Sequence, residues 1–249
     1  MKTEQKNEFL TLWRRYFASA ELPIAFYYTD QEEVELVPPP SGHECLIAAL
    51  AKVREGHSLR FNKASVGCGG GKKFTGFSPQ IGPNFEYFLS CGIPGKLEGE
   101  RYKKSPELVK ESLGHAPSWT APHRYIVFKR WDKLDEADHP DVVVFFATPD
   151  VLSGLFTLVN FDEAEPNGVF CPFAAGCSSI VMHPYLEKDS GRPRAVLGMF
   201  DVSARPHVEK DTLTLAVPFN KFEKMVRNMP ESFLITASWD KVKKRLPSS

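Results

Sequence analysis

The sequence lacks the features that would assign it to a membrane, an export pathway or a nucleic acid. Its most apolar runs, such as Val142–Ala147, have the length of a strand and are too short to span a bilayer. The N-terminus lacks the apolar core and the small-residue cleavage site of a secretory signal. The 31 basic residues are balanced by 31 acidic ones, so there is no basic excess to neutralise phosphates. We expect no membrane span, no export and no nucleic-acid partner.

Two further absences concern the cysteines. The chain has no Asn-x-Ser/Thr glycosylation acceptor, and no two of its five cysteines have the C-x-x-C spacing. An odd number of cysteines without a local pairing motif fits a reducing compartment better than a disulfide framework. We therefore expect a cytoplasmic protein whose thiols are free, buried or bound to a metal.

Common catalytic motifs are also missing. The sequence contains no G-x-S-x-G nucleophile elbow, no H-E-x-x-H pair and no deaminase-type zinc motif. The glycine-rich stretch Ser65–Gly76 resembles a phosphate-binding loop but fails as one. A Walker A motif ending at Gly71-Lys72 needs glycine at position 66 and serine or threonine at position 73, where this chain has Val66 and Lys73. The usual hydrolase and nucleotide-binding classes therefore have no support.

The composition is that of an ordinary globular protein, with 42% hydrophobic and 25% charged residues. Hydrophobic periodicity predicts an α+β fold with mixed or antiparallel sheets and flanking helices. Strands are expected at 24–29, 61–66, 124–131, 142–147, 195–200, 212–217 and 232–236. Helices are expected at 4–20, 42–55, 105–113, 149–159 and 221–228, and in a terminal segment capped at residue 238. Residues 95–122 are polar and rich in glycine and proline, as in a surface excursion, a lid or a linker.

The glycine run itself suggests a binding function. Glycine costs backbone entropy and buries no side chain, so three in a row indicate a sharp turn or the close approach of a ligand. The N–H groups of Gly69, Gly70 and Gly71, together with Lys72, would cradle an anion beside Cys68. The alternative is a plain turn at the end of a strand.

Two segments share an order of features that suggests an internal duplication. In each, a cysteine near a helix start is followed by the helix, a connector and a strand that ends at a glycine. Cys45 then corresponds to Cys177, and Gly67 corresponds to Gly198. The corresponding halves would be residues 21–122 and 123–249, with the cysteine-bearing turns facing a shared cleft.

Together these features resemble the family known as domain of unknown function 169, an uncharacterised ArCR group from bacteria and archaea. The resemblance rests on a cysteine that opens a helix, Cys45, on Cys68-Gly69 at a strand end, and on a second cysteine-led helix at Cys177. It continues with Arg205 and with an apolar strand that ends in proline, residues 213–218. It covers most of the chain, which implies a single family domain over residues 1–249. The family pattern has another cysteine in the turn 197–201, and this chain has none there. The resemblance implies a fold but no activity.

Three functions remain open from the sequence. The first is a small-ligand, metal or cofactor site in a cleft lined by Cys45, Cys68, residues 69–71 and Cys177, because soft thiolates select zinc or an iron–sulfur cluster. The second is a cysteine-dependent enzyme for a small anionic substrate, which Lys72 or Arg205 would hold. A histidine base would activate its thiol, with candidates at 43, 183 and 207. The third is a structural or interaction protein, in which the cysteines are buried apolar residues.

Overall fold

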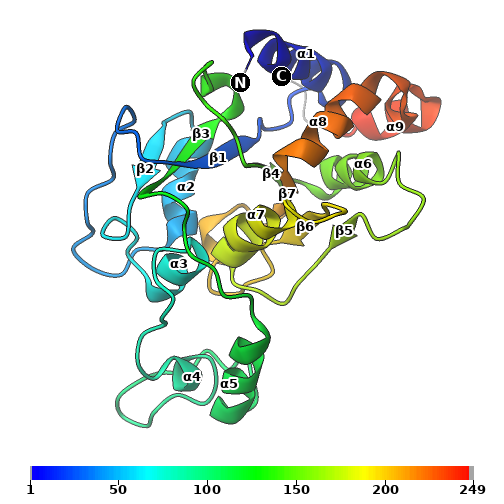
Figure 1. Ribbon diagram of the computed structural model, residues 1–249. Coiled ribbons are helices and arrows are strands. Elements are labelled where there is room, and N and C mark those ends of the chain that lie inside the picture. Colours follow the sequence, from blue (N-terminus) through cyan, green and yellow to red (C-terminus); the bar gives the residue numbers. More distant parts are fainter. Residues whose placement is uncertain (1, 247–249) are drawn as a thin grey trace.

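A computed structural model describes residues 2–246, and these residues form one seven-stranded mixed sheet with helices on both faces (Figure 1). The strand order is β2-β3-β1-β4-β7-β6-β5. Neighbouring strands are antiparallel except in the parallel β5–β6 pair. The strands are β1 (Ile24–Thr29), β2 (Leu59–Phe61), β3 (Tyr125–Arg130), β4 (Val142–Ala147), β5 (Val169–Phe170), β6 (Ala195–Gly198) and β7 (Leu213–Pro218). The α+β class expected from the sequence is confirmed.

One face of the sheet is covered by an aromatic helical layer. Phe9, Trp13 and Phe17 recur every four residues and give α1 a single buried stripe. The Trp13 ring lies 4.3 Å from that of Phe17 and 5.3 Å from that of Phe145 on β4, measured between centroids. Ring contacts of this kind bind the helices to the sheet beyond the effect of apolar burial alone. The helices of this layer are α1 (Thr3–Phe17), α6 (Pro149–Val159), α8 (Phe219–Asn228) and α9 (Ala237–Lys243).

The opposite face carries the helices that matter for the candidate site. They are α2 (Leu46–Arg54), α3 (Gly69–Phe74) and α7 (His183–Glu187). A π-helical turn, Ser178–Met182, leads directly into α7. Pro184 lies inside this continuous helical run, directly after the change from π-helical to α-helical residues.

Residues 77–122, here called the arm, project from the body (Figure 1). The arm contains the short helices α4 (Phe85–Phe88) and α5 (Pro106–His115). At its base, the N–H of Ala121 donates to the carbonyl of Gly76 at 2.9 Å. The chain therefore leaves and re-enters the body at one place, which is the geometry of an insertion.

The strand order is the same on both sides of the central β1–β4 pair. Moving outward, β1 is followed by β3 and β2, while β4 is followed by β7 and β6. Each outer strand also has a parallel neighbour, because Leu36 bridges Arg60 of β2 and β5 pairs with β6. This order is what a duplication would produce, with its boundary between β3 and β4 rather than at residue 122. The duplication stays a prediction.

Several expected elements are wrong or displaced. The strand expected at 61–66 ends at Phe61, and the strand expected at 232–236 is a 3₁₀ turn over Phe233–Ile235. The helix expected at 42–55 begins only at Leu46 and ends at Arg54. Thr236, rather than residue 238, caps α9, because its hydroxyl accepts the N–H of Trp239. Apart from the segment 232–236, these errors lie at element ends, where assigned boundaries commonly shift by one or two residues or more.

The helices are short in relation to a bilayer. The 15-residue α1 is only about 22 Å long, at 1.5 Å per residue. Among residues 2–246, none of the helices has both the length and the apolar character needed to cross a membrane.

Candidate functional site

Three cysteines each stand directly before a helix on the same face of the sheet. Cys45 and Cys68 are the N-cap residues of α2 and α3, and Cys177 precedes the π-helical turn that leads into α7. Cys45 and Cys68 are partly buried, and Cys177 is buried. The first N–H groups of a helix have no partner within the helix, and the thiols of Cys45 and Cys68 lie beside such groups.

The backbone just before Cys68 packs closely against the residue that precedes Cys45, and Gly67 makes this contact possible. A Cβ atom on Gly67 would lie 2.8 Å from the backbone nitrogen of Glu44 and 2.9 Å from its Cβ. Only glycine lets the backbone before Cys68 pass this closely beside the backbone before Cys45. The two cysteines therefore follow two residues that are in direct contact.

A second close contact connects the Cys177 segment to the same place. A Cβ atom on Gly176 would lie 3.3 Å from Cγ1 of Ile47, in the first turn of α2. It would also lie 3.1 Å from Sδ of Met199, in the turn after β6. The residue beside Cys177 thus lies between the start of α2 and the turn after β6.

The glycine-rich stretch is a helix and not the expected loop. Residues 69–74 form α3, and the Cys68 Sγ accepts the N–H of Gly71 at 3.1 Å. At the other end, the Thr75 hydroxyl donates to the carbonyl of Gly71 at 2.7 Å. A Cβ on Gly71 would lie 2.8 Å from Val66 and 2.9 Å from the Cys68 Sγ, so this glycine is needed for packing. Capping and packing here override the poor helix propensity of glycine.

The thiols of Cys45, Cys68 and Cys177 interact, and this affects the pKa of Cys45 and of Cys177. Burial is the largest effect on Cys177 and raises the pKa of its thiol well above the usual value, and the thiols of Cys68 and Cys45 raise this pKa further. Burial also raises the pKa of the Cys45 thiol, although the N–H groups of Ile47 and Ala48 oppose this rise. We call Cys45, Cys68 and Cys177 the three-cysteine site.

Asp201 lies beside the three-cysteine site and is the main feature that the sequence did not indicate. Its Oδ2 accepts the N–H of Gly176 at 3.0 Å, and its Oδ1 accepts the hydroxyl of Tyr102 at 3.0 Å. Its charge contributes to the raised pKa of both Cys45 and Cys177. Asp201 therefore ties the Cys177 segment to the arm.

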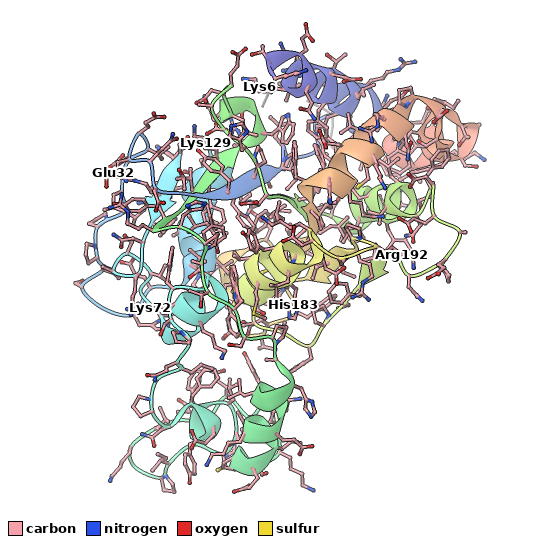
Figure 2. All side chains as sticks on the ribbon, in the orientation of Figure 1. Lys6, Glu32, Lys72, Lys129, His183 and Arg192 are labelled. Carbon is pink, nitrogen blue, oxygen red and sulfur yellow. The ribbon has the colours of Figure 1, made fainter. Side chains whose placement is uncertain are left out.

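The two basic residues proposed from the sequence differ in their availability. The Arg205 guanidinium donates to the carbonyls of Thr212, Glu209 and Lys210, so it holds its own loop. Lys72 is half-buried on α3 (Figure 2). Of the two, Lys72 is the better placed to meet an anionic group near Cys68.

The three thiols do not form a ready metal site. Among residues 2–246, no three His, Cys, Asp or Glu side chains are arranged to hold a metal ion. Metal binding would therefore require the cysteines to change rotamer. Cys91, which lies on the arm, and Cys171, which follows β5, are exposed.

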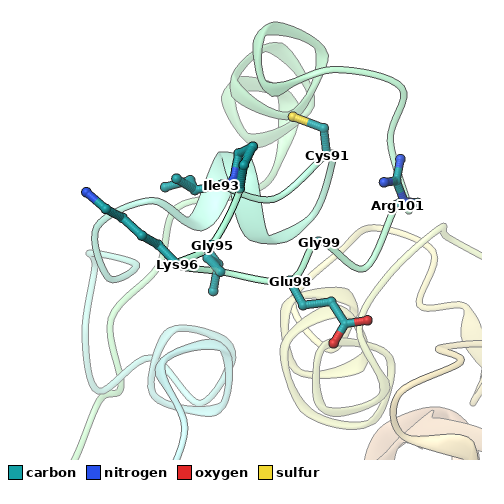
Figure 3. A pocket seen from close by; sticks show the side chains of 9 residues that line it. Cys91, Ile93, Gly95, Lys96, Glu98, Gly99 and Arg101 are labelled. Atoms are coloured by element: carbon teal, nitrogen blue, oxygen red, sulfur yellow. The ribbon is translucent and has the colours of Figure 1, made fainter.

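A surface hollow of about 540 Å³ lies on the arm (Figure 3). Its wall is formed by residues 93–99 with Cys91 and Arg101. None of the ligand-binding residues expected from the sequence lines it. A second hollow, of about 480 Å³, includes Glu163 and Lys221 in its lining.

Comparisons with known proteins give one result. The model of the family described as DUF169, uncharacterised ArCR, matches residues 16–228, which is most of the chain. Comparisons with curated proteins and with solved structures found no significant match.

Proposed function

The chain belongs to the DUF169 family of uncharacterised ArCR proteins, so we propose its function from its own residues. We propose that the protein binds a thiophilic metal centre, either zinc or an iron–sulfur cluster, through Cys45, Cys68 and Cys177. The observation that carries this proposal is the contact between helix starts that each follow a cysteine, on one face of the sheet. Thiolate sulfur is the ligand type that selects these metals.

The surroundings of the thiols favour metal binding over nucleophilic catalysis. Cys177 belongs to an apolar cluster with Ile47 and Ile180, and Cys45 packs against this cluster. Burial raises the pKa of both thiols, so near neutral pH they are protonated and weakly nucleophilic. A bound cation would reverse this preference, because coordinated thiols lose their protons.

The glycines of α3 would leave an approach to Cys68 for a cofactor or a small ligand. A Cβ on Gly69 would meet no heavy atom closer than 3.9 Å, and Gly69 is exposed. Gly70 has similar space, with only the Phe74 ring near its Cβ position. Lys72, on the same helix, supplies a positive charge for an anionic group of the bound molecule.

The first experiment is metal analysis of protein purified without oxygen, combined with its visible spectrum. We expect a bound metal, and a charge-transfer band if it is an iron–sulfur cluster. Cys45→Ser, Cys68→Ser and Cys177→Ser should each lower the metal content. The exposed Cys91→Ser and Cys171→Ser are matched controls that should keep it.

Two outcomes would contradict the proposal. Protein that contains no metal and takes up neither zinc nor iron and sulfide on reconstitution would exclude it. If, in addition, Cys68 is alkylated at a pH below the range in which ordinary thiols react, and the other cysteines are not, a cysteine-dependent enzyme explains the site better. If no substitution of a cysteine or of Lys72 changes the affinity for any ligand, the remaining explanation is that the protein has a structural or interaction role.

A further inference from the structure

A polar hollow lies at the end of the sheet where β5 and β6 begin and β7 ends. The strands β5 and β6 are parallel neighbours, and β7 runs antiparallel to β6, so these three strand ends lie together. Residues 162–164 precede β5, residues 190–193 precede β6, and α8 follows β7 directly. These three segments line the second hollow described above, of about 480 Å³. Its volume is within the range of small-molecule binding sites.

Polar contacts connect the three segments that line this hollow. The Glu163 carboxylate accepts from Arg192 Nε at 2.7 Å and from Lys221 Nζ at 2.6 Å, so it joins the segment before β5 to the other two. The Asn220 side chain donates to the carbonyl of Lys188 at 3.0 Å, which ties the start of α8 to the residue after α7. The polar groups of the lining are therefore held in place without a ligand.

Lys221 gives the clearest indication of a ligand. Its side chain is only 4% exposed and lines the hollow. An ammonium group has three N–H donors. Among residues 2–246, Lys221 Nζ has one hydrogen-bond acceptor, the Glu163 carboxylate. Because a buried donor without an acceptor is costly, the hollow must supply further acceptors to Lys221, either from water or from a bound molecule.

The lining also contains two opposite charges that the protein does not pair. Lys224 lies three residues after Lys221 in α8, so the two lysines lie on the same side of the helix. Asp162 lies on another wall of the hollow. Within the described part of the chain, neither Lys224 nor Asp162 forms an ion pair or a side-chain hydrogen bond. The hollow thus offers one unpaired positive charge and one unpaired negative charge.

We propose that this hollow binds a small zwitterion with a carboxylate and an ammonium group, as in a free amino acid. The carboxylate of the ligand accepts from Lys221 and Lys224, and its ammonium group donates to the Asp162 carboxylate. Each unpaired charge of the lining then meets one charge of the ligand, and Lys221 gains an acceptor. Phosphate suits the hollow less well, because Asp162 would repel it. The hollow includes none of the three cysteines, so this site is independent of the proposed metal centre.

The test is a titration of ¹⁵N-labelled protein at neutral pH, followed through the backbone amide signals of Gly191 and Lys221, which both line the hollow. The probes are glycine, which carries both charges, acetate, which carries only the carboxylate, and inorganic phosphate. We expect glycine to bind more tightly than acetate by up to about fivefold, the contribution of one exposed ion pair. Phosphate should bind more weakly than glycine.

Two substitutions at exposed positions separate the two contacts without disturbing the buried ion pair. Lys224→Met should weaken the binding of glycine and of acetate alike, by up to about fivefold. Asp162→Asn should weaken glycine binding by a similar factor but leave acetate binding unchanged or tighter, because it removes a charge that repels acetate. Lys63→Met is the matched control, since Lys63 is exposed and follows β2 at the opposite edge of the sheet. It should change neither affinity.

Three outcomes would overturn the proposal. The first is that neither glycine nor a mixture of the standard amino acids shifts the signals of the wild type. The second is that acetate or phosphate binds as tightly as glycine does. The third is that Lys224→Met and Asp162→Asn both bind glycine as the wild type does. Cys68→Ser should bind glycine normally, so a failure of the proposed metal centre and a failure of this site can be told apart.

Discussion

At the scale of single residues, glycines determine how closely the helices approach one another. Gly154 on α6 is buried, and a Cβ there would collide with Cη2 of Trp239 and lie 2.8 Å from its Cζ3 and 3.0 Å from Cε1 of Phe17. We expect Gly154→Ala to overpack this junction of three helices. The loss, about 1–3 kcal/mol, should exceed the gain of up to about 1 kcal/mol in helix propensity. A lower urea midpoint for unfolding would confirm it.

Gly114 provides the matched control for this prediction. It lies in α5, and a Cβ there would have no heavy atom within 4 Å. Gly114→Ala should therefore leave the urea midpoint unchanged or raise it slightly. If both variants raise the midpoint, the three-helix junction is looser than the contacts of Gly154 indicate.

A partly buried ion pair at Glu163 predicts a pH-dependent stability. Its carboxylate accepts from Lys221 Nζ at 2.6 Å and from Arg192 Nε at 2.7 Å, and the Lys221 side chain is only 4% exposed. The bond from Lys221, followed by that from Arg192, lowers the pKa of Glu163 below 4.5 despite the opposing effect of burial. The stabilisation is therefore complete above pH 4.5 and is lost as the pH falls through the lowered pKa.

Glu163→Gln should thus destabilise the protein by about 1–3 kcal/mol near neutral pH, because a hydrogen bond to a buried charge is weakened. The difference from the wild type should shrink as the pH falls below 4.5, since the wild-type carboxyl then also becomes neutral. Urea unfolding at several pH values measures this difference. Glu98→Gln, at an exposed position on the arm, is the control. A difference that stays constant down to pH 3 would contradict the ion-pair explanation.

At the scale of elements, helices and strands with a strong hydrophobic pattern were predicted correctly, whereas helix caps were not. The strand at 24–29 and the helix at 149–159 have the expected bounds, because β-branched and aromatic runs and a Thr-Pro-Asp start are strong local signals. The helix α3 was missed because Gly69-Gly70-Gly71 has poor propensity and its cap is a cysteine sulfur, which no capping rule includes.

The candidate site was predictable only in part. The order of cysteines, helix starts and strand ends in the sequence indicated that Cys45, Cys68 and Cys177 belong together. Nothing in the sequence indicated the left-handed Met199 or the bonds of Asp201 to the arm, because both depend on contacts between distant segments. The functional role of the three cysteines stays a prediction.

The arm is an element whose attachment can be tested separately. The Tyr102 hydroxyl bonds Asp201 and accepts the N–H of Ser203 at 2.7 Å, and Lys103 lies 4.5 Å from the Phe173 ring centroid. We expect Tyr102→Phe to speed amide hydrogen exchange in the arm and leave the sheet unchanged, because few other contacts hold the arm at this point. Hydrogen exchange followed by mass spectrometry measures this effect.

Tyr125→Phe is the control for the arm, because its hydroxyl bonds Glu32 at the other edge of the sheet. It should not alter exchange in the arm. If Tyr102→Phe also leaves the arm unchanged, the base of the arm at Gly76 and Ala121 is sufficient to hold it.

At the scale of the whole molecule, the single sheet joins two layers that differ in composition. The aromatic layer contains Trp13, Trp131 and Trp239, each no more than 3% exposed, whereas Cys177 lies in the layer on the other face. Every strand from β1 to β7 belongs to one continuous sheet, so neither layer keeps its packing surface if the other half of the sheet is lost. The two proposed repeat halves are therefore expected to fold as one unit, whatever their origin.

This continuity predicts a single cooperative unfolding transition of the metal-free protein. Tryptophan fluorescence reports mainly on the aromatic layer, and alkylation of Cys177, measured on its peptide by mass spectrometry, reports on the opposite layer. Because both layers depend on the same strands, we expect the two urea transitions to have the same midpoint. Cys171, which is exposed in the folded protein, should react at all urea concentrations and provides the labelling control. Alkylation of Cys177 at urea concentrations where tryptophan fluorescence is still native would show that the cysteine-bearing layer opens on its own.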